Sequence, residues 1–137
     1  MSAYSRSSSL AAYQSVSAHG SVAAADPHQL IVMLMDGALE RIAGARGAMA
    51  NDVPALKVRM IHRVIEIIAE LRASLDFQAG GVIAANLGDL YDYCSQRLMT
   101  ANVENRPELL DEVGNLLREI RGAWIAIPGA ARNGAGR

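Results

Sequence analysis

The chain has 137 residues, of which 51% are hydrophobic and only 4% aromatic. This length suits one domain with a useful core, and the aliphatic composition favours packed helices, so the sequence predicts an all-α fold. The formal net charge of -1 gives no electrostatic reason for nucleic acid or an anionic membrane to be a partner. Partners that recognise shape and apolar surface are therefore favoured.

Cysteine usage and hydropathy predict the compartment. A single cysteine, Cys94, cannot form an internal disulfide, which is typical of proteins in a reducing cytoplasm. The stretch from Met1 to Leu10 has no apolar run long enough for a signal peptide. Charged residues interrupt every apolar segment well before the ~18 residues that a membrane span requires. We expect a cytoplasmic protein without stable membrane insertion.

The first helix is predicted from Pro27 to about Ala48. Residues 1–25 mix Ser, Ala and Gly with isolated larger residues, which predicts a flexible N-terminal arm. Asp26 is a good N-cap, Pro27 fits the first turn, and Gln29 stands three residues after the cap, as in a capping box. The helix should therefore begin directly after Asp26.

Three further helices follow in chain order. Asn51, Asp52 and Pro54 predict a second helix from about Pro54 to Asp76, which Gly80 and Gly81 separate from a third, Val82 to Asn102. Pro107 begins a fourth helix that runs through Trp124, and residues 128–137 predict a disordered tail. Four helices of roughly 20 residues with short connections predict an antiparallel four-helix bundle over residues 26–127.

The apolar residues are spread unevenly over these helices. On the first, Leu30, Leu34 and Ile42 share a face, yet Val32 and Leu39 point nearly the opposite way. The second has an apolar arc of about 200°, against about 100° for the third and fourth. The narrow seams comprise Ile83, Leu87, Leu90, Tyr91, Cys94, Leu98 and Ala101 on the third helix, and Leu109, Leu110, Val113, Leu116, Leu117, Ile120 and Trp124 on the fourth. The sequence thus predicts surplus apolar surface on the first two helices.

Motifs that would carry catalysis are missing. None of the three histidines follows a glutamate by three residues, so a carboxylate-bridged metal pair is not indicated. Zinc-ligand spacings, a cysteine cluster and a phosphate-binding loop are also absent from the sequence. Cys94 lies on the core seam, which favours a buried, inert thiol. We expect no enzymatic activity, no cofactor and no metal.

The charged and imidazole side chains have simple structural interpretations. His28 and His62 fall on polar sectors of their helices, which indicates solvated imidazoles. The basic residues of the second helix share its surface with acidic ones at pairing distance, which predicts a solvated face. This group comprises Lys57, Arg59, Arg63, Glu66 and Glu70.

Several apolar and aromatic residues have no evident internal role. Tyr93 projects off the third seam, while Met33, Met35 and Leu39 occupy the flanks of the first helix. Each could line a wide core, contact the N-terminal arm, or form a groove. Methionine is flexible and polarizable, which suits a groove that accepts an irregular apolar peptide.

Six stretches of the sequence resemble the flagellar secretion chaperone FliS family. They cover about Tyr13 to Trp124 in unbroken order. The matching stretches are Asp26–Ile31, Met33–Ala38, Gly80–Leu87, Leu90–Tyr93, Leu98–Asn102 and Arg118–Trp124.

The resemblance implies a four-helix bundle that binds the disordered C-terminal segment of flagellin in the cytoplasm. Such a chaperone prevents premature polymerisation and delivers flagellin to the flagellar type III secretion apparatus. It would recognise an amphipathic segment in a groove, with binding coupled to folding. Contacts with export-gate components are a further implied partnership.

The resemblance also implies the flagellin-binding residues. Tyr13 matches the tyrosine of the family's N-terminal arm, which can cover the apolar surface when the client is absent. Met35 stands where the family usually has tyrosine. The implied set is Tyr13, Leu30, Met33, Leu34, Met35, Asp36, Leu39, Tyr91 and Tyr93.

A second hypothesis is a helical adaptor or homodimeric scaffold that uses the same apolar surface on itself. The chaperone hypothesis instead predicts a monomer or low-order homo-oligomer that gains one flagellin chain.

Overall fold

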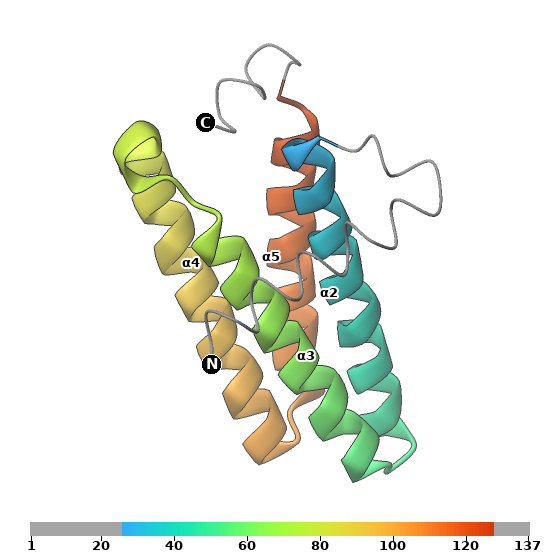
Figure 1. Cartoon of the computed structure of the whole chain (residues 1–137). Helices are drawn as coiled ribbons and strands as arrows, with labels where there is room; N and C mark the ends of the chain where they lie inside the picture. The colour runs from blue at the N-terminus through green and yellow to red at the C-terminus, as the bar shows by residue number, and fades with distance from the viewer. Residues whose placement is uncertain (1–25, 128–137) are drawn as a thin grey trace, which may run out of the picture.

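In the computed structural model, the described residues, 26–127, form four antiparallel helices (Figure 1). They are α2 (Pro27–Ala50), α3 (Pro54–Ala73), α4 (Phe77–Glu104) and α5 (Pro107–Ile125). The predicted all-α four-helix bundle is confirmed. The arm predicted for residues 1–25 and the tail predicted for residues 128–137 lie outside the described residues.

Each helix packs against two neighbours around one core. α2 lies between α3 and α5, and α4 closes the bundle on the other side, also between α3 and α5. α2 and α4 are therefore diagonal to each other. The largest fully buried side chains are aliphatic or sulfur-containing, as the composition indicated: Leu34, Met35, Ile61, Val64, Ile67, Ile68, Leu71, Cys94, Leu98, Leu110, Val113 and Leu117.

The predicted start of α2 is confirmed. The Asp26 carboxylate accepts a hydrogen bond from the backbone N–H of Gln29 at 2.8 Å, and Pro27 occupies the first turn. Because Pro lacks the N–H that would be unsatisfied there, the proline and the Asp26 cap together remove two of the unpaired donors at this helix end. The helix ends at Ala50, close to the predicted Ala48.

The boundary between the second and third helices differs from its prediction. α3 ends at Ala73 and α4 begins at Phe77, because the Asp76 carboxylate accepts hydrogen bonds from the backbone N–H groups of Gln78 and Ala79 at 3.1 and 2.9 Å. The predicted break is nevertheless present inside α4. Gly81 has φ 54° and ψ −128°, which interrupts the helical path after one turn.

Two residues that were predicted to be solvated are buried. Lys57 is only 7% exposed, and its ammonium donates to the carbonyl oxygen of Asn102 at 2.9 Å and to Oδ1 of Asn105 at 2.7 Å. It thereby binds the C-terminal end of α4, where a cation is favoured by the helix dipole. Glu70 is buried as well. The solvated-face prediction is wrong for these two, whereas Arg63 and Glu66 do pair across that surface, at 3.3 Å.

His28 is a further correction. The residue is only 9% exposed and its ring stacks on the ring of Trp124, so the interpretation as a solvated imidazole is wrong. The polar sector that contains His28 on α2 faces the last turn of α5, which the helical pattern of α2 alone could not reveal. His62, in contrast, is exposed as predicted.

Candidate binding surface

The exposed large apolar side chains of the described residues gather on α4. Two others, Val53 and Ile125, stand at helix ends. The α4 members are Phe77, Val82, Ile83, Tyr93, Met99 and Val103. The prediction that surplus apolar surface lies on the first two helices is therefore wrong. The surplus lies on α4, the third predicted helix, for which a narrow apolar seam was expected.

Packing explains this reversal. The wide apolar arc of α3 is buried between α2 and α4, since Ile61, Ile67 and Ile68 are each at most 1% exposed. On α4, Tyr91 and Cys94 are buried as the seam predicted, but Ile83 is 74% exposed. Ile83 lies just after the break at Gly81, where the helix has few neighbours.

An open apolar groove of about 460 Å³ lies between α3 and α4. Ile65 on α3 and Met99 and Val103 on α4 provide its apolar surface. Met99 is 53% exposed and Val103 is 81% exposed, one helical turn apart. His62, Glu66 and Asn102 supply its polar edge. This groove can accept an amphipathic segment whose apolar side chains recur at helical spacing.

A polar cluster lies across the α4–α5 face. The Tyr93 hydroxyl donates to one oxygen of the Glu112 carboxylate, and Nε of Arg97 donates to the other at 2.9 Å. The Arg97 guanidinium also lies 5.6 Å from the centre of the Tyr93 ring. The bond from Tyr93, and then that from Arg97, holds the pKa of Glu112 below its ordinary value. The cluster therefore holds the exposed Tyr93 ring through polar contacts with Glu112 and Arg97.

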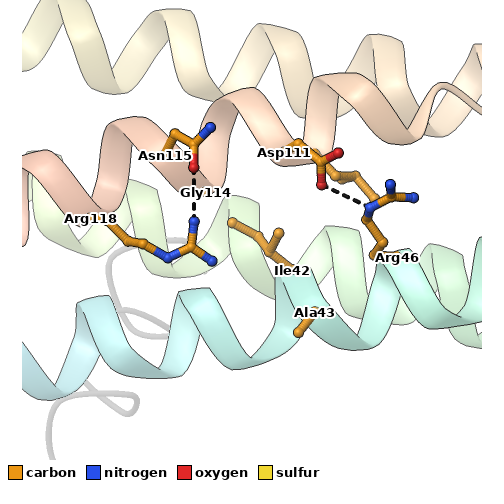
Figure 2. Close-up of a pocket in the computed structure, with 8 residues that line it drawn as sticks. Ile42, Ala43, Arg46, Asp111, Gly114, Asn115 and Arg118 are labelled. Carbon is orange, nitrogen blue, oxygen red and sulfur yellow. Dashed lines mark hydrogen bonds and ion pairs between the residues drawn. The ribbon is translucent and has the colours of Figure 1, made fainter.

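A second groove, of about 490 Å³, lies between α2 and α5 on the opposite side of the bundle (Figure 2). Arg46 and Asp111 form an ion pair of 2.8 Å toward one end, and Arg118 donates to Asn115 at 3.0 Å toward the other. Ile42 and Gly114 lie between them (Figure 2). Its walls are more polar than those of the α3–α4 groove, and none of the exposed apolar residues of α4 lines it.

Among the described residues, those implied to bind flagellin are either buried in the core, half-buried or exposed. Leu34, Met35 and Tyr91 are at most 3% exposed, which places their side chains in the core, and burial raises the pKa of Tyr91. The remaining members on α2 are half-buried: Leu30, Met33, Asp36 and Leu39. Asp36 accepts a hydrogen bond from Nε of Arg121 on α5 at 2.6 Å.

The structure does not bring this set together at one place. Tyr93 is 39% exposed but lies on α4, diagonal to α2. Tyr13 lies outside the described residues. Met35 is 1% exposed, so it occupies a packed site rather than the flank predicted for it. Tyr93 and the half-buried α2 residues are exposed enough to contact a partner directly.

Met99 and Val103 are not among the binding residues predicted from the sequence, because that prediction rested on the width of each apolar seam. The available signal was their position: both fall outside the Tyr91–Cys94–Leu98 seam, although they are apolar and four residues apart. Apolar residues away from the core stripe indicate a binding surface more directly than does a wide stripe.

The chemistry available at these surfaces is mainly that of apolar contact. Within residues 26–127, no three His, Cys, Asp or Glu side chains stand together as a metal site. Cys94 is buried, as predicted, and burial raises its pKa to about 11, which keeps the thiol protonated at neutral pH. None of the described helices is both long and apolar enough to cross a membrane.

Comparison with known proteins assigns the family. The family model described as flagellar protein FliS matches residues 9–131. The flagellar secretion chaperone FliSB of Pseudomonas aeruginosa is 47% identical over 115 residues, which cover 84% of this chain and 91% of the relative. The flagellar secretion chaperone FliS of Vibrio cholerae is 40% identical over 88% of both chains. That of Salmonella typhimurium is 41% identical over 88% of this chain and 90% of its own.

The matched region contains all four helices, both grooves and the exposed residues of α4. The chain belongs to the FliS family of flagellar secretion chaperones.

Proposed function

We propose that this protein binds the disordered C-terminal segment of flagellin, prevents its premature polymerisation and delivers it to the flagellar type III secretion apparatus. The observation that carries the proposal is the coincidence of family membership with large apolar side chains exposed along α4. A segment that folds as it binds needs extensive apolar contact to offset the entropy it loses on ordering.

The α3–α4 groove is proposed as the main contact. Its apolar residues lie on two adjacent helices, so an amphipathic helix laid between them would cover Met99 and Val103 together. The half-buried residues Leu30, Met33 and Leu39 extend the proposed contact to α2, and Tyr93 extends it across α4. Leu34, Met35 and Tyr91 support these surfaces from the core, and Asp36 fixes α5 through Arg121.

The proposed setting follows from the proposed client. The protein would act in the cytoplasm as a monomer or low-order homo-oligomer, hold one flagellin chain, and then contact export-gate components. Tyr13 and its arm would cover part of the apolar surface in the absence of flagellin. Enzymatic activity forms no part of this proposal.

Co-elution with flagellin tests the proposal. The protein is mixed with full-length flagellin and with flagellin that lacks its C-terminal segment, and each mixture is analysed by size-exclusion chromatography with light scattering. A complex with one full-length flagellin and none with the truncated form is expected. Capture of both forms would contradict the proposed binding mode, and a self-association that flagellin does not alter would favour the homodimeric scaffold instead.

A further inference from the structure

The first turn of α4 folds back on the helix that follows it. The Phe77 ring lies against Gly88, since a Cβ atom built on Gly88 would stand 3.2 Å from Cε1 of Phe77. In a continuous helix these residues would be separated by about 16 Å along the axis. The contact therefore exists only because the chain changes direction between them, at Gly81.

Two glycines make this reversal possible. Gly81 has φ 54°, a value that L-residues rarely adopt, and a Cβ atom there would meet nothing within 4 Å. Its role is thus conformational. Gly80 is required for space, because a Cβ atom on it would stand 2.7 Å from Cβ of Ala84. Gly80 and Gly81 therefore form a pivot, at which the chain changes direction, rather than a simple helix end.

The surface beneath the Phe77 ring is organised independently of the turn. Gly88 is buried and contributes a flat floor without a side chain. The Arg72 guanidinium lies 5.6 Å from the centre of the Phe77 ring and forms two hydrogen bonds with Asp92, at 2.8 and 3.2 Å. This bidentate pair fixes the guanidinium plane, which is a good surface for an aromatic or flat apolar group.

The turn itself is held by few contacts. Phe77 is 45% exposed, so nearly half of its apolar surface still faces solvent. The other residues from Gln78 to Ile83 are exposed, and the turn is closed mainly by the Asp76 cap and the bond from the Gly80 N–H to the Asp76 carbonyl at 2.7 Å. Val82 and Ile83, 75% and 74% exposed, directly follow the pivot.

We propose that the Phe77–Gly80 turn is a releasable strap, and that Phe77 occupies in the free protein a site for one aromatic or large aliphatic side chain of the bound segment. The strap swings at Gly81, the incoming side chain takes the place of Phe77 over Gly88, and Val82 and Ile83 contact the residues on either side. This inference rests on the proposed function, because the incoming side chain belongs to flagellin. The strap thus lowers affinity for segments that cannot displace it.

Two variants that both loosen the strap separate this role from a structural one. Phe77→Ala empties the site, whereas Gly88→Ala places a methyl group on its floor, 3.2 Å from the ring, which must then shift by a few tenths of an ångström. Both should speed amide hydrogen exchange at Gln78, Ala79 and Gly80 relative to the wild type. Gly122→Ala, at an open position on α5, should leave exchange in the strap unchanged and is the matched control.

Flagellin affinity is then measured by isothermal titration calorimetry with the full chain. Phe77→Ala should bind roughly fivefold more tightly, because the competing side chain is gone and the competent state is fully populated. Gly88→Ala should show no gain, since its methyl group fills the site. Phe77→Gln repeats the test should Phe77→Ala not fold.

Unchanged or weaker binding by both Phe77 variants would overturn the strap, as would a gain in Gly88→Ala equal to that in Phe77→Ala. Unaltered exchange at Gln78–Gly80 in both loosened variants would overturn it as well. Failure of the wild type to bind flagellin would instead overturn the proposed function, and the strap's role with it. The two failures are therefore distinguishable. A failure of the proposed function appears in the wild type, whereas a failure of the strap appears only in the comparison among variants.

Discussion

His28 and Trp124 join the first turn of α2 to the last turn of α5 through three contacts. Nε2 of His28 donates to the Trp124 carbonyl at 2.8 Å, and Nε1 of Trp124 donates to the His28 carbonyl at 3.0 Å. Their rings stack at 4.9 Å between centroids and 9° between planes. The contacts are reciprocal, because each side chain donates to the backbone carbonyl of the other residue. The Trp124 carbonyl stands at the C-terminal end of α5, where carbonyl groups lack helical partners.

Trp124→Ala should therefore damage folding rather than binding alone. Loss of the ring and of its hydrogen bond is expected to lower the free energy of unfolding by about 2 to 4 kcal/mol. Urea denaturation followed by circular dichroism measures this change. Trp124→Phe keeps an aromatic ring against His28 and should lose only about 1 kcal/mol. Equal losses in the two variants would show that stacking contributes nothing.

Glu112 should make stability depend on pH in the acid range. Hydrogen bonds from Tyr93 and Arg97 hold its pKa below the ordinary 4.5. Because the folded-state pKa is lowered, the stabilisation is present above the unfolded-state pKa and is lost as pH falls through the folded-state value. Wild type should thus exceed Glu112→Gln in stability at pH 7, with a difference that shrinks below pH ~4.5. Urea denaturation of both proteins from pH 7 to pH 3 measures the difference, and a pH-independent gap would contradict this assignment.

Lys57→Met tests the bond between α3 and the end of α4. The substitution keeps most of the apolar stem but leaves the Asn102 carbonyl and Asn105 Oδ1 without their ammonium donor. A loss of about 1 to 3 kcal/mol in unfolding free energy is expected by thermal or urea denaturation. Arg59→Met, at an exposed position on the same helix, is the control and should change stability by less than about 0.5 kcal/mol.

Val103→Asp should separate binding from stability. Val103 is 81% exposed, so a charge there remains solvated and the free energy of unfolding should change by less than about 0.5 kcal/mol. A charge facing an apolar segment in the α3–α4 groove should weaken flagellin binding by at least about tenfold, as measured by calorimetry. Ile125→Asp places the same charge at an exposed apolar residue of α5, and an equal loss there would remove the groove from the binding surface.

The resemblance places Tyr93 and Leu39 among the flagellin-binding residues, so Tyr93→Ala and Leu39→Asp should both weaken flagellin binding. Tyr93 is exposed, and it contacts the Glu112 and Arg97 side chains on the α4–α5 face, so Tyr93→Ala should leave helicity intact. Leu39 packs against the core, so Leu39→Asp should also lower stability, by about 1 to 3 kcal/mol. Calorimetric binding alongside urea denaturation tests both, and a folded Leu39→Asp of wild-type stability would contradict its packing role.

The sequence-based predictions that the structure confirms depend on residues close together in the chain. The start of α2 at Asp26 and Pro27 and the beginning of α5 at Pro107 depend on capping and on the missing proline N–H, which act within a few residues. The burial of Cys94 and Leu98 follows from helical periodicity. The helix-breaking preference of glycine likewise predicted a break at Gly80 and Gly81. It did not predict the turn of helix that precedes this break.

The sequence by itself determined that the chain is helical, where most helices begin and which stripe of each faces inward, because these depend on neighbours along the chain. Only the tertiary structure decided how much of each stripe is buried, since that depends on which helices meet. The wide arc of α3 is covered by α2 and α4, and the large apolar residues left exposed on α4 include Val82, Met99 and Val103. The tertiary structure likewise decided that His28 and Lys57 are buried, because their partners, Trp124 and Asn102, lie 96 and 45 residues away in the chain.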